Sequence, residues 1–240
     1  MKEYPYKFTL NNTNEEINFK YWTLREEKDL FLEANNPNLT KIETSKIFLE
    51  FFKSHIKEKD LFNNFSKVDI FQLMIELRSY SKGNNIQYEW KCTNDKCSAK
   101  DELQNNTFDI TKDFIFPKDN LKTLTIKDYT FNFKRLNIFK ELDIIETNIS
   151  TPNQTKFDIL LSSIDSILLN NKLLTFSGLE DIKNYILDCP PFVGIDLSKK
   201  YSEIVPEIKI IKTNNCVSCK NKYPLSVGEL NFFFTFLLLA

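Results

Sequence analysis

Apolar residues recur at helical spacing through most of the first eighty positions. Thr23-Leu24-Arg25-Glu26 is a capping box, so a helix is expected to start there and to run towards Ala34. The apolar residues of 42–56 predict a second, amphipathic helix. Residues 66–83 are apolar on most of a helical circumference and end in Gly83, which predicts a central helix with a glycine stop. The region 1–83 is therefore predicted to be mainly helical.

After Gly83 the pattern changes to short alternating segments. Strands are predicted at 86–91 and 107–110, and a hairpin is predicted from 121–126 and 130–136, with its turn at Lys127-Asp128. Residues 84–136 therefore form a predicted β region.

Helical periodicity returns further along the chain. Helices are expected at 138–149, 157–169 and 192–204, with strands at 173–176 and 207–212. Ser177-Gly178-Leu179-Glu180 has the form of a second capping box and opens a helix that must stop before Pro190-Pro191.

No repeat and no long low-complexity linker divides the sequence. The fold expected is α+β in one domain over 1–240: a helical layer (1–83), a β region (84–136), a helical insertion (137–205) and a C-terminal element (206–240). The longest apolar run, Phe232 to Ala240, is far shorter than the ~20 residues of a transmembrane helix. It is interpreted as a buried terminal helix or strand, and no membrane span is expected.

Four of the five cysteines form two pairs, each between strand-like segments. Cys92 and Cys97 have four residues between them, and Cys216 and Cys219 have two. Two such turns facing each other are the geometry of a zinc ribbon, and four thiolates form a closed tetrahedral site with no open position for water or substrate. The sequence therefore predicts one structural zinc ion bound by Cys92, Cys97, Cys216 and Cys219, in a split, zinc-ribbon-like β region.

The long separation of the two pairs has a structural consequence. If the site forms, residues between the pairs become an insertion, and metal binding makes the whole chain one folding unit. Two alternatives remain open: four buried free thiols, or a redox-active CxxC at Cys216, for which no thioredoxin-like βαβ pattern is present. Cys189, before Pro190, is interpreted as a small buried apolar residue.

Composition and charge narrow the function classes. With 32 basic and 33 acidic residues the net charge is −1, so no overall field attracts nucleic acid or an anionic membrane. The 22 phenylalanines reflect either an AT-rich genome or aromatic side chains that cover partner surfaces. The first residues lack the apolar core of a secretory signal, which favours a cytosolic protein in which disulfides are not expected.

No catalytic constellation is found in the sequence. His55 is the single histidine, and it is interpreted as a surface or helix-end residue. Phosphate-binding glycine loops, G-x-S-x-G and H-E-x-x-H are absent from the sequence. We therefore expect neither catalytic nor cofactor-binding residues, and a protein that is not an enzyme.

A nucleic-acid-binding zinc ribbon is the alternative function. Six lysines surround the cysteine pairs: Lys91, Lys96, Lys100, Lys212, Lys220 and Lys222. Asp95, Asp101 and Glu102 in the same region, and the neutral overall charge, count against this alternative.

The order of short motifs resembles the T4-type bacteriophage baseplate hub family. The motifs are Trp-Thr-Leu-Arg-Glu-Glu-Lys at 22–28, Leu-Arg-Ser-Tyr-Ser-Lys-Gly at 77–83, the cysteine pair that follows, and a late CxxC before Asn-Phe-Phe-Phe at 231–234. The four-residue spacing of Cys92 and Cys97 departs from the tighter pair expected in the family.

The resemblance implies a non-enzymatic structural or assembly protein of a contractile phage tail. It implies a virion protein of the tail baseplate, assembled in the host bacterial cytoplasm, and membership of a multi-subunit complex with other hub and tail proteins. The region around Trp22 and the segment Leu230 to Leu239 are the candidate contact surfaces, with ordinary core as the alternative for both.

Overall fold

The computed structural model describes residues 3–117, 123–148, 152–205 and 208–225. These residues divide into two compact units, one made of 3–62, 68–117 and 208–225, and one made of 63–67, 123–148 and 152–205. The segment Leu230 to Leu239, a candidate contact surface, lies outside the described residues. Helices and small antiparallel sheets occur in both units, which confirms the α+β class.

The first unit begins with a hairpin that packs on helices. Strands β1 (Tyr6–Thr9) and β2 (Glu16–Phe19) are followed by α1 (Leu24–Ala34), α2 (Lys41–Ser54), α3 (Lys59–Phe62) and α4 (Lys67–Lys82). The buried Gln72 of α4 ties the hairpin to the helix: its amide accepts from the Asn11 N–H at 2.9 Å and donates to the Thr9 carbonyl at 3.0 Å. The sequence pattern predicted a mainly helical region here and did not reveal this hairpin.

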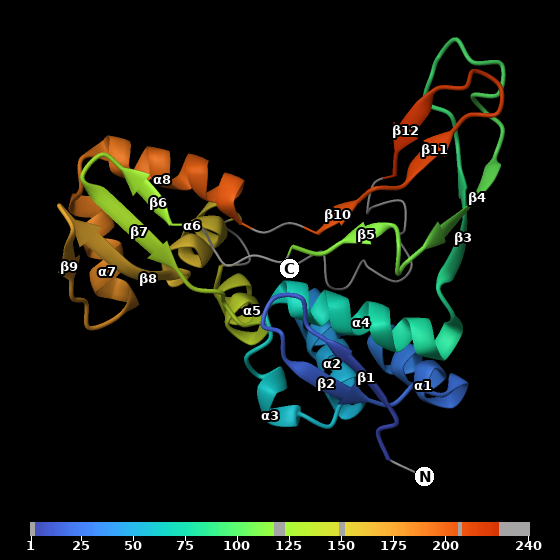
Figure 1. Ribbon diagram of the computed structural model, residues 1–240, viewed down its shortest axis with the longest axis horizontal. Coiled ribbons are helices and arrows are strands. Elements are labelled where there is room, and N and C mark those ends of the chain that lie inside the picture. Colours follow the sequence, from blue (N-terminus) through green and yellow to red (C-terminus); the bar gives the residue numbers. More distant parts are fainter. Residues whose placement is uncertain (1–2, 118–122, 149–151, 206–207, 226–240) are drawn as a thin grey trace. The chain divides into compact units, whose positions relative to one another are not determined.

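Three pairs of short antiparallel strands complete the first unit. Strand β3 (Asn85–Trp90) pairs with β4 (Gln104–Asp109), β5 (Phe114–Ile115) with β10 (Lys209–Ile210), and β11 (Thr213–Asn215) with β12 (Lys222–Pro224). Segments from the middle and from the late part of the sequence therefore lie side by side in this unit (Figure 1).

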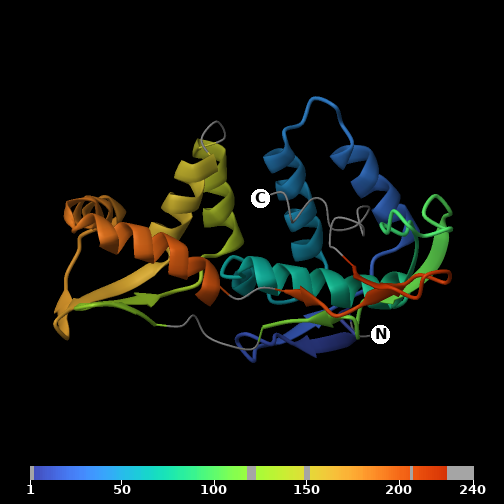
Figure 2. The same ribbon diagram turned by 90° about the horizontal axis from the view of Figure 1, so that it is seen from above.

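The second unit is a four-stranded antiparallel sheet with helices on one face (Figure 2). The strands run in the order β6 (Leu124–Ile126), β7 (Tyr129–Phe133), β8 (Ile164–Leu169) and β9 (Lys172–Leu174). The helices are α5 (Ile138–Thr147), α6 (Pro152–Ser162), α7 (Leu179–Asp188) and α8 (Pro191–Ile204). Phe131, Leu161, Ile167, Val193 and Leu197 form the centre of the core between them.

The expectation of one helix over 157–169 was wrong in its second half. Helix α6 ends at Ser162, and Ile164 begins β8, which pairs with β7 on one side and β9 on the other. Asn170 and Asn171 connect β8 to β9 with φ of 51° and 62°, the conformation of a type I′ hairpin turn. Pairing on both edges therefore overrides the helical spacing of the apolar residues.

The two sequences read as capping boxes behave differently. Thr23 accepts from the Glu26 N–H at 3.2 Å, and the Glu26 carboxylate accepts from the Thr23 N–H at 2.7 Å, which confirms the first box. At the second, the N-cap is Gly178, so Glu180 stands one position too early, and Asp181 instead accepts from the Ser177 N–H at 3.1 Å. The second prediction was wrong, because the N-cap of this helix lies one residue later than the sequence pattern indicated.

Removing the first cap tests its energetic role. We expect Thr23→Ala to lower the free energy of unfolding by about 1 kcal/mol, since the Glu26 N–H at the helix end loses the hydroxyl that accepts from it. Thermal unfolding followed by circular dichroism measures the change. Glu180→Ala, at the position where the second box does not form, serves as the control and should change stability by less than half of that amount.

Candidate metal centre

The structure brings together the four cysteines predicted to bind metal. The Sγ atoms of Cys92, Cys97, Cys216 and Cys219 all lie within 4.8 Å of one another, and among the described residues this is the one group of histidine, cysteine and acidic side chains placed to hold an ion. Cys92, Cys97 and Cys216 are buried, with exposures of 2%, 8% and 1%. The four thiols could therefore bind a metal away from solvent.

Two of the sulfur–sulfur distances match a tetrahedral site. The Cys92 and Cys219 Sγ atoms are 3.7 Å apart, and those of Cys97 and Cys216 are 3.6 Å apart. A tetrahedron with Zn–S bonds of 2.3 Å has sulfur–sulfur edges of about 3.8 Å. A disulfide bond requires about 2.05 Å, and all five cysteines are free thiols.

Each cysteine pair occupies the loop of an antiparallel hairpin. Cys92 and Cys97 lie between β3 and β4, and Cys216 and Cys219 lie between β11 and β12. Strand pairing fixes both ends of each loop. The sulfurs of one loop lie next to those of the other. This is the arrangement of two facing hairpins that the sequence predicted.

Backbone N–H groups are directed at the sulfurs. The N–H of Ala99 donates to Cys97, and the N–H of Asn221 donates to Cys219, so the second cysteine of each pair receives a bond from the residue two positions later. Lys220, between Cys219 and Asn221, has a φ of 60°, a left-handed conformation that is uncommon for lysine. N–H···S bonds of this kind stabilise thiolate over thiol, as metal ligation requires.

The pKa values follow from these bonds. Donation from the Cys219 N–H and from the Gln104 amide lowers the pKa of Cys216 to about 6. The pKa of Cys219 is lowered chiefly by the Asn221 N–H. Although the Ala99 N–H acts in the opposite direction, burial and the neighbouring sulfurs raise the pKa of Cys97 to about 11. Without a cation the four sulfurs do not all ionise, and a divalent ion would supply the missing positive charge.

Three polar residues that contact the cysteines or their hairpins were not predicted from the sequence. Gln104 joins the two hairpins: its Nε2 donates to Cys216 Sγ at 3.5 Å, and its Oε1 accepts from the Val217 N–H at 3.2 Å. Tyr223 places its hydroxyl 3.3 Å from Cys92 Sγ, and Asn214 accepts from the Asn106 amide at 2.9 Å. Only the strand pairing reveals them, because no spacing rule marks a glutamine or tyrosine as a support of a metal site.

The remaining candidate residues lie apart from the cysteine cluster. Cys189 is half-buried at the end of α7 and packs on the core of the second unit. His55 is 1% exposed, so its interpretation as a surface residue was wrong, although it is the C-cap of α2. Trp22 is 5% exposed and packs against Phe51, so its side chain is core rather than contact surface.

Lysines near the cluster are partly engaged within the protein. Lys100 forms an ion pair with Asp95, and the Lys220 ammonium donates to the Val217 carbonyl at 2.7 Å. The ion pair offsets the positive charge of Lys100, and the carbonyl occupies one of the N–H donors of Lys220, which leaves less for a phosphate backbone.

The comparison with protein families decides the identity. The family model described as T4 bacteriophage base plate protein matches residues 1–235. The chain belongs to this family. No curated protein and no solved structure matches it.

Family membership places this base plate protein in the tail of a phage virion, as part of a multi-protein complex. It also confirms the family resemblance seen in the sequence motifs. In the part of the base plate protein that the structure describes, none of the helices has the length and apolar character needed to cross a bilayer.

Proposed function

We propose that this base plate protein is a structural or assembly component of the base plate hub, that it binds other hub and tail proteins, and that Cys92, Cys97, Cys216 and Cys219 hold one structural zinc ion. The observation that supports the zinc is the set of four sulfurs within 4.8 Å of one another, two of whose edges are 3.6 and 3.7 Å. The observation that supports the hub is the order of motifs within a family match that spans nearly the whole chain.

The proposed zinc has a mechanical role. It would join the β3–β4 loop to the β11–β12 loop, which are far apart in the sequence. With four protein ligands no coordination position remains for water or substrate, so the ion would contribute folding free energy and not Lewis-acid chemistry. A non-enzymatic protein assembled in the host bacterial cytoplasm fits this role, because thiols stay reduced there.

The assembly role is tested in the phage that encodes the chain. We expect a nonsense mutation early in its gene to yield particles without functional base plates, and we expect the intact gene supplied in trans to restore infectivity. Electron microscopy of the particles and plaque counts measure the outcome. Complete base plates and normal plaque numbers in the mutant would contradict the proposal.

The zinc-ribbon alternative is tested separately. A nucleic-acid-binding protein loses affinity steeply as salt rises, so titrating purified protein with DNA across a salt series discriminates the two functions. We expect no binding at low salt.

A further inference from the structure

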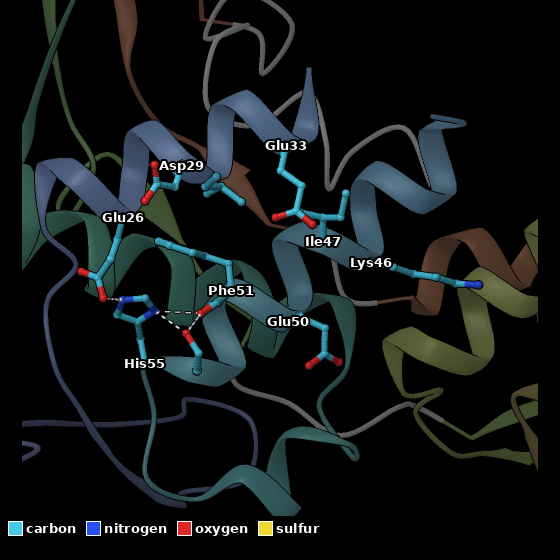
Figure 3. Close-up of a pocket in the computed structure, with 10 residues that line it drawn as sticks. Glu26, Asp29, Glu33, Lys46, Ile47, Glu50, Phe51 and His55 are labelled. Atoms are coloured by element: carbon cyan, nitrogen blue, oxygen red, sulfur yellow. Dashed lines mark hydrogen bonds and ion pairs between the residues drawn. The ribbon is translucent and has the colours of Figure 1, made fainter. Parts of the chain in front are cut away.

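A pocket of about 470 Å³ lies between α1 and α2. The two helices lie side by side and are joined by the loop 35–40 (Figure 2). Four carboxylates and one ammonium group line the pocket, together with apolar side chains: Glu26, Asp29, Glu33, Glu50 and Lys46, with Leu30, Ile47 and Phe51 (Figure 3). The helices thus supply a strongly acidic surface above an apolar floor.

His55, the single histidine of the sequence, lines the same pocket. Its side chain is 2% exposed. Its Nδ1 lies 2.8 Å from the Phe51 carbonyl oxygen and 3.0 Å from Ser54 Oγ. A carbonyl oxygen only accepts, so this contact assigns the hydrogen to Nδ1, and in the neutral ring Nε2 carries a lone pair.

That lone pair faces another acceptor. Nε2 has no hydrogen-bond partner among the described residues, and Glu26 Oε1 lies 3.6 Å away, within ion-pair distance of a protonated ring but too far for a hydrogen bond (dashed in Figure 3). The other Glu26 oxygen is already used, since it accepts from the Thr23 N–H at 2.7 Å and from the Thr23 hydroxyl at 2.8 Å. Two acceptors, held in place by separate contacts, therefore face each other without a donor. A buried acceptor without a donor is costly.

The charges around His55 favour a cation as the missing donor. Burial, and to a smaller extent the charge of Lys20, lower the pKa of His55 below its ordinary value, in spite of the opposing effects of the Phe51 carbonyl and Glu26. The ring is therefore neutral at pH 7.5 and does not itself neutralise the carboxylates. Lys46 extends away from His55, while Asp29, Glu33 and Glu50 are exposed (Figure 3).

We propose that this pocket binds an arginine side chain of a partner protein in the base plate. A planar guanidinium presents several N–H donors at once, so it can donate to both His55 Nε2 and Glu26 Oε1, whereas an ammonium lacks that fixed fork. The Phe51 ring offers a surface for the methylene stem and the cation. The inference rests on the proposed function for the partner's location, but the pocket itself is tested on the isolated protein.

The His55 ring reports binding without interference from other histidines. We expect N-acetyl-L-arginine N′-methylamide, titrated at pH 7.5, to shift the ¹⁵N resonance of His55 Nε2 saturably, with a dissociation constant on the order of 1 mM. The citrulline counterpart has the same shape but no charge, and we expect no saturable shift from it. An equal response to citrulline, equally tight binding of the lysine counterpart, or no saturable shift with arginine would overturn the proposal.

A matched pair of variants locates the contact. Glutamine preserves a capping box, so Glu26→Gln keeps the start of α1 while it removes the charge beside His55. We expect this change to weaken arginine binding about tenfold. Glu43→Gln makes the same change in the capping box of α2, outside the pocket, and should leave binding unaltered. If both variants weaken arginine binding equally, the effect is one of general surface charge, and the proposed site is refuted.

The two proposals fail independently. Loss of arginine binding with zinc still bound would remove the pocket alone. Absence of zinc, or normal base plates in the nonsense mutant, would leave the arginine titration of the purified protein unaffected.

Discussion

The double substitution Cys216→Ser and Cys219→Ser is expected to abolish zinc binding and to lower the thermal midpoint of unfolding by more than about 10 °C. Protein purified without added zinc should contain one zinc ion per chain, and the double variant essentially none. The effect is large because binding by four thiolates is folding free energy, and a site that joins two hairpins distant in sequence has no preformed counterpart in the unfolded chain. Elemental mass spectrometry and circular dichroism measure the two quantities.

Cys189→Ser is the matched control. Cys189 is a free thiol outside the four-sulfur cluster, so its replacement should leave the zinc content unchanged. Parent protein that is well folded and metal-free would refute the zinc proposal and leave the four cysteines as buried thiols. A disulfide in that protein would be a separate result, visible as loss of free thiols.

The pH dependence of zinc binding follows from the thiolates. The pKa of Cys216 is lowered to about 6, chiefly by the Cys219 N–H, from an unfolded value near 9. A lowered pKa contributes stability that is fully present above the unfolded value and is lost as the pH falls through the folded value. Zinc must also displace the proton of Cys97, whose pKa is raised to about 11, so zinc affinity should fall as the pH is lowered, and more steeply below about pH 6, where Cys216 also takes up a proton.

The sequence predicts the clustered cysteines better than their surroundings. Paired cysteines have a spacing that few other structures require, so the four cysteines that cluster could be named without coordinates. Gln104 and Asn214 could not be found in this way, because their contacts with the opposite hairpin depend on how β3–β4 meets β11–β12. His55 was missed as a pocket residue for a similar reason: a single histidine at a helix end has no pattern, and only the packing of α1 on α2 buries it.

The errors in the fold have a common physical origin. Helices with caps or a glycine stop, such as α1 and α4, were predicted because their signals are local. The β1–β2 hairpin and strand β8 were missed because their conformation depends on partners. Strand β8 is stabilised by β7 and β9 together, and the hairpin is held by Gln72 from a helix more than fifty residues later.

Phe131→Ala is the second change with a large expected effect. Phe131 is fully buried in the middle of the second unit, where it packs with Leu161, Ile167 and Val193. Truncating a buried phenylalanine loses the transfer free energy of the ring and leaves a cavity, so the free energy of unfolding should fall by about 3–5 kcal/mol. Leu173→Ala on β9 is the control, because Leu173 is 63% exposed and should cost less than about 1 kcal/mol.

Phe131→Ala also tests whether the chain is a single folding unit. Apart from residues 63–67, the second unit is inserted between β5 and β10, whose pairing of Phe114–Ile115 with Lys209–Ile210 closes the insertion. Unfolding of the insertion would release a long flexible loop between these strands, and its closure entropy would weaken the nearby hairpins. We therefore expect one cooperative transition, in which zinc release, followed with a colorimetric chelator, moves to lower temperature together with the loss of the sheet. If Phe131→Ala lowers the midpoint of the sheet while zinc stays bound, the two units unfold independently and the one-domain hypothesis is wrong.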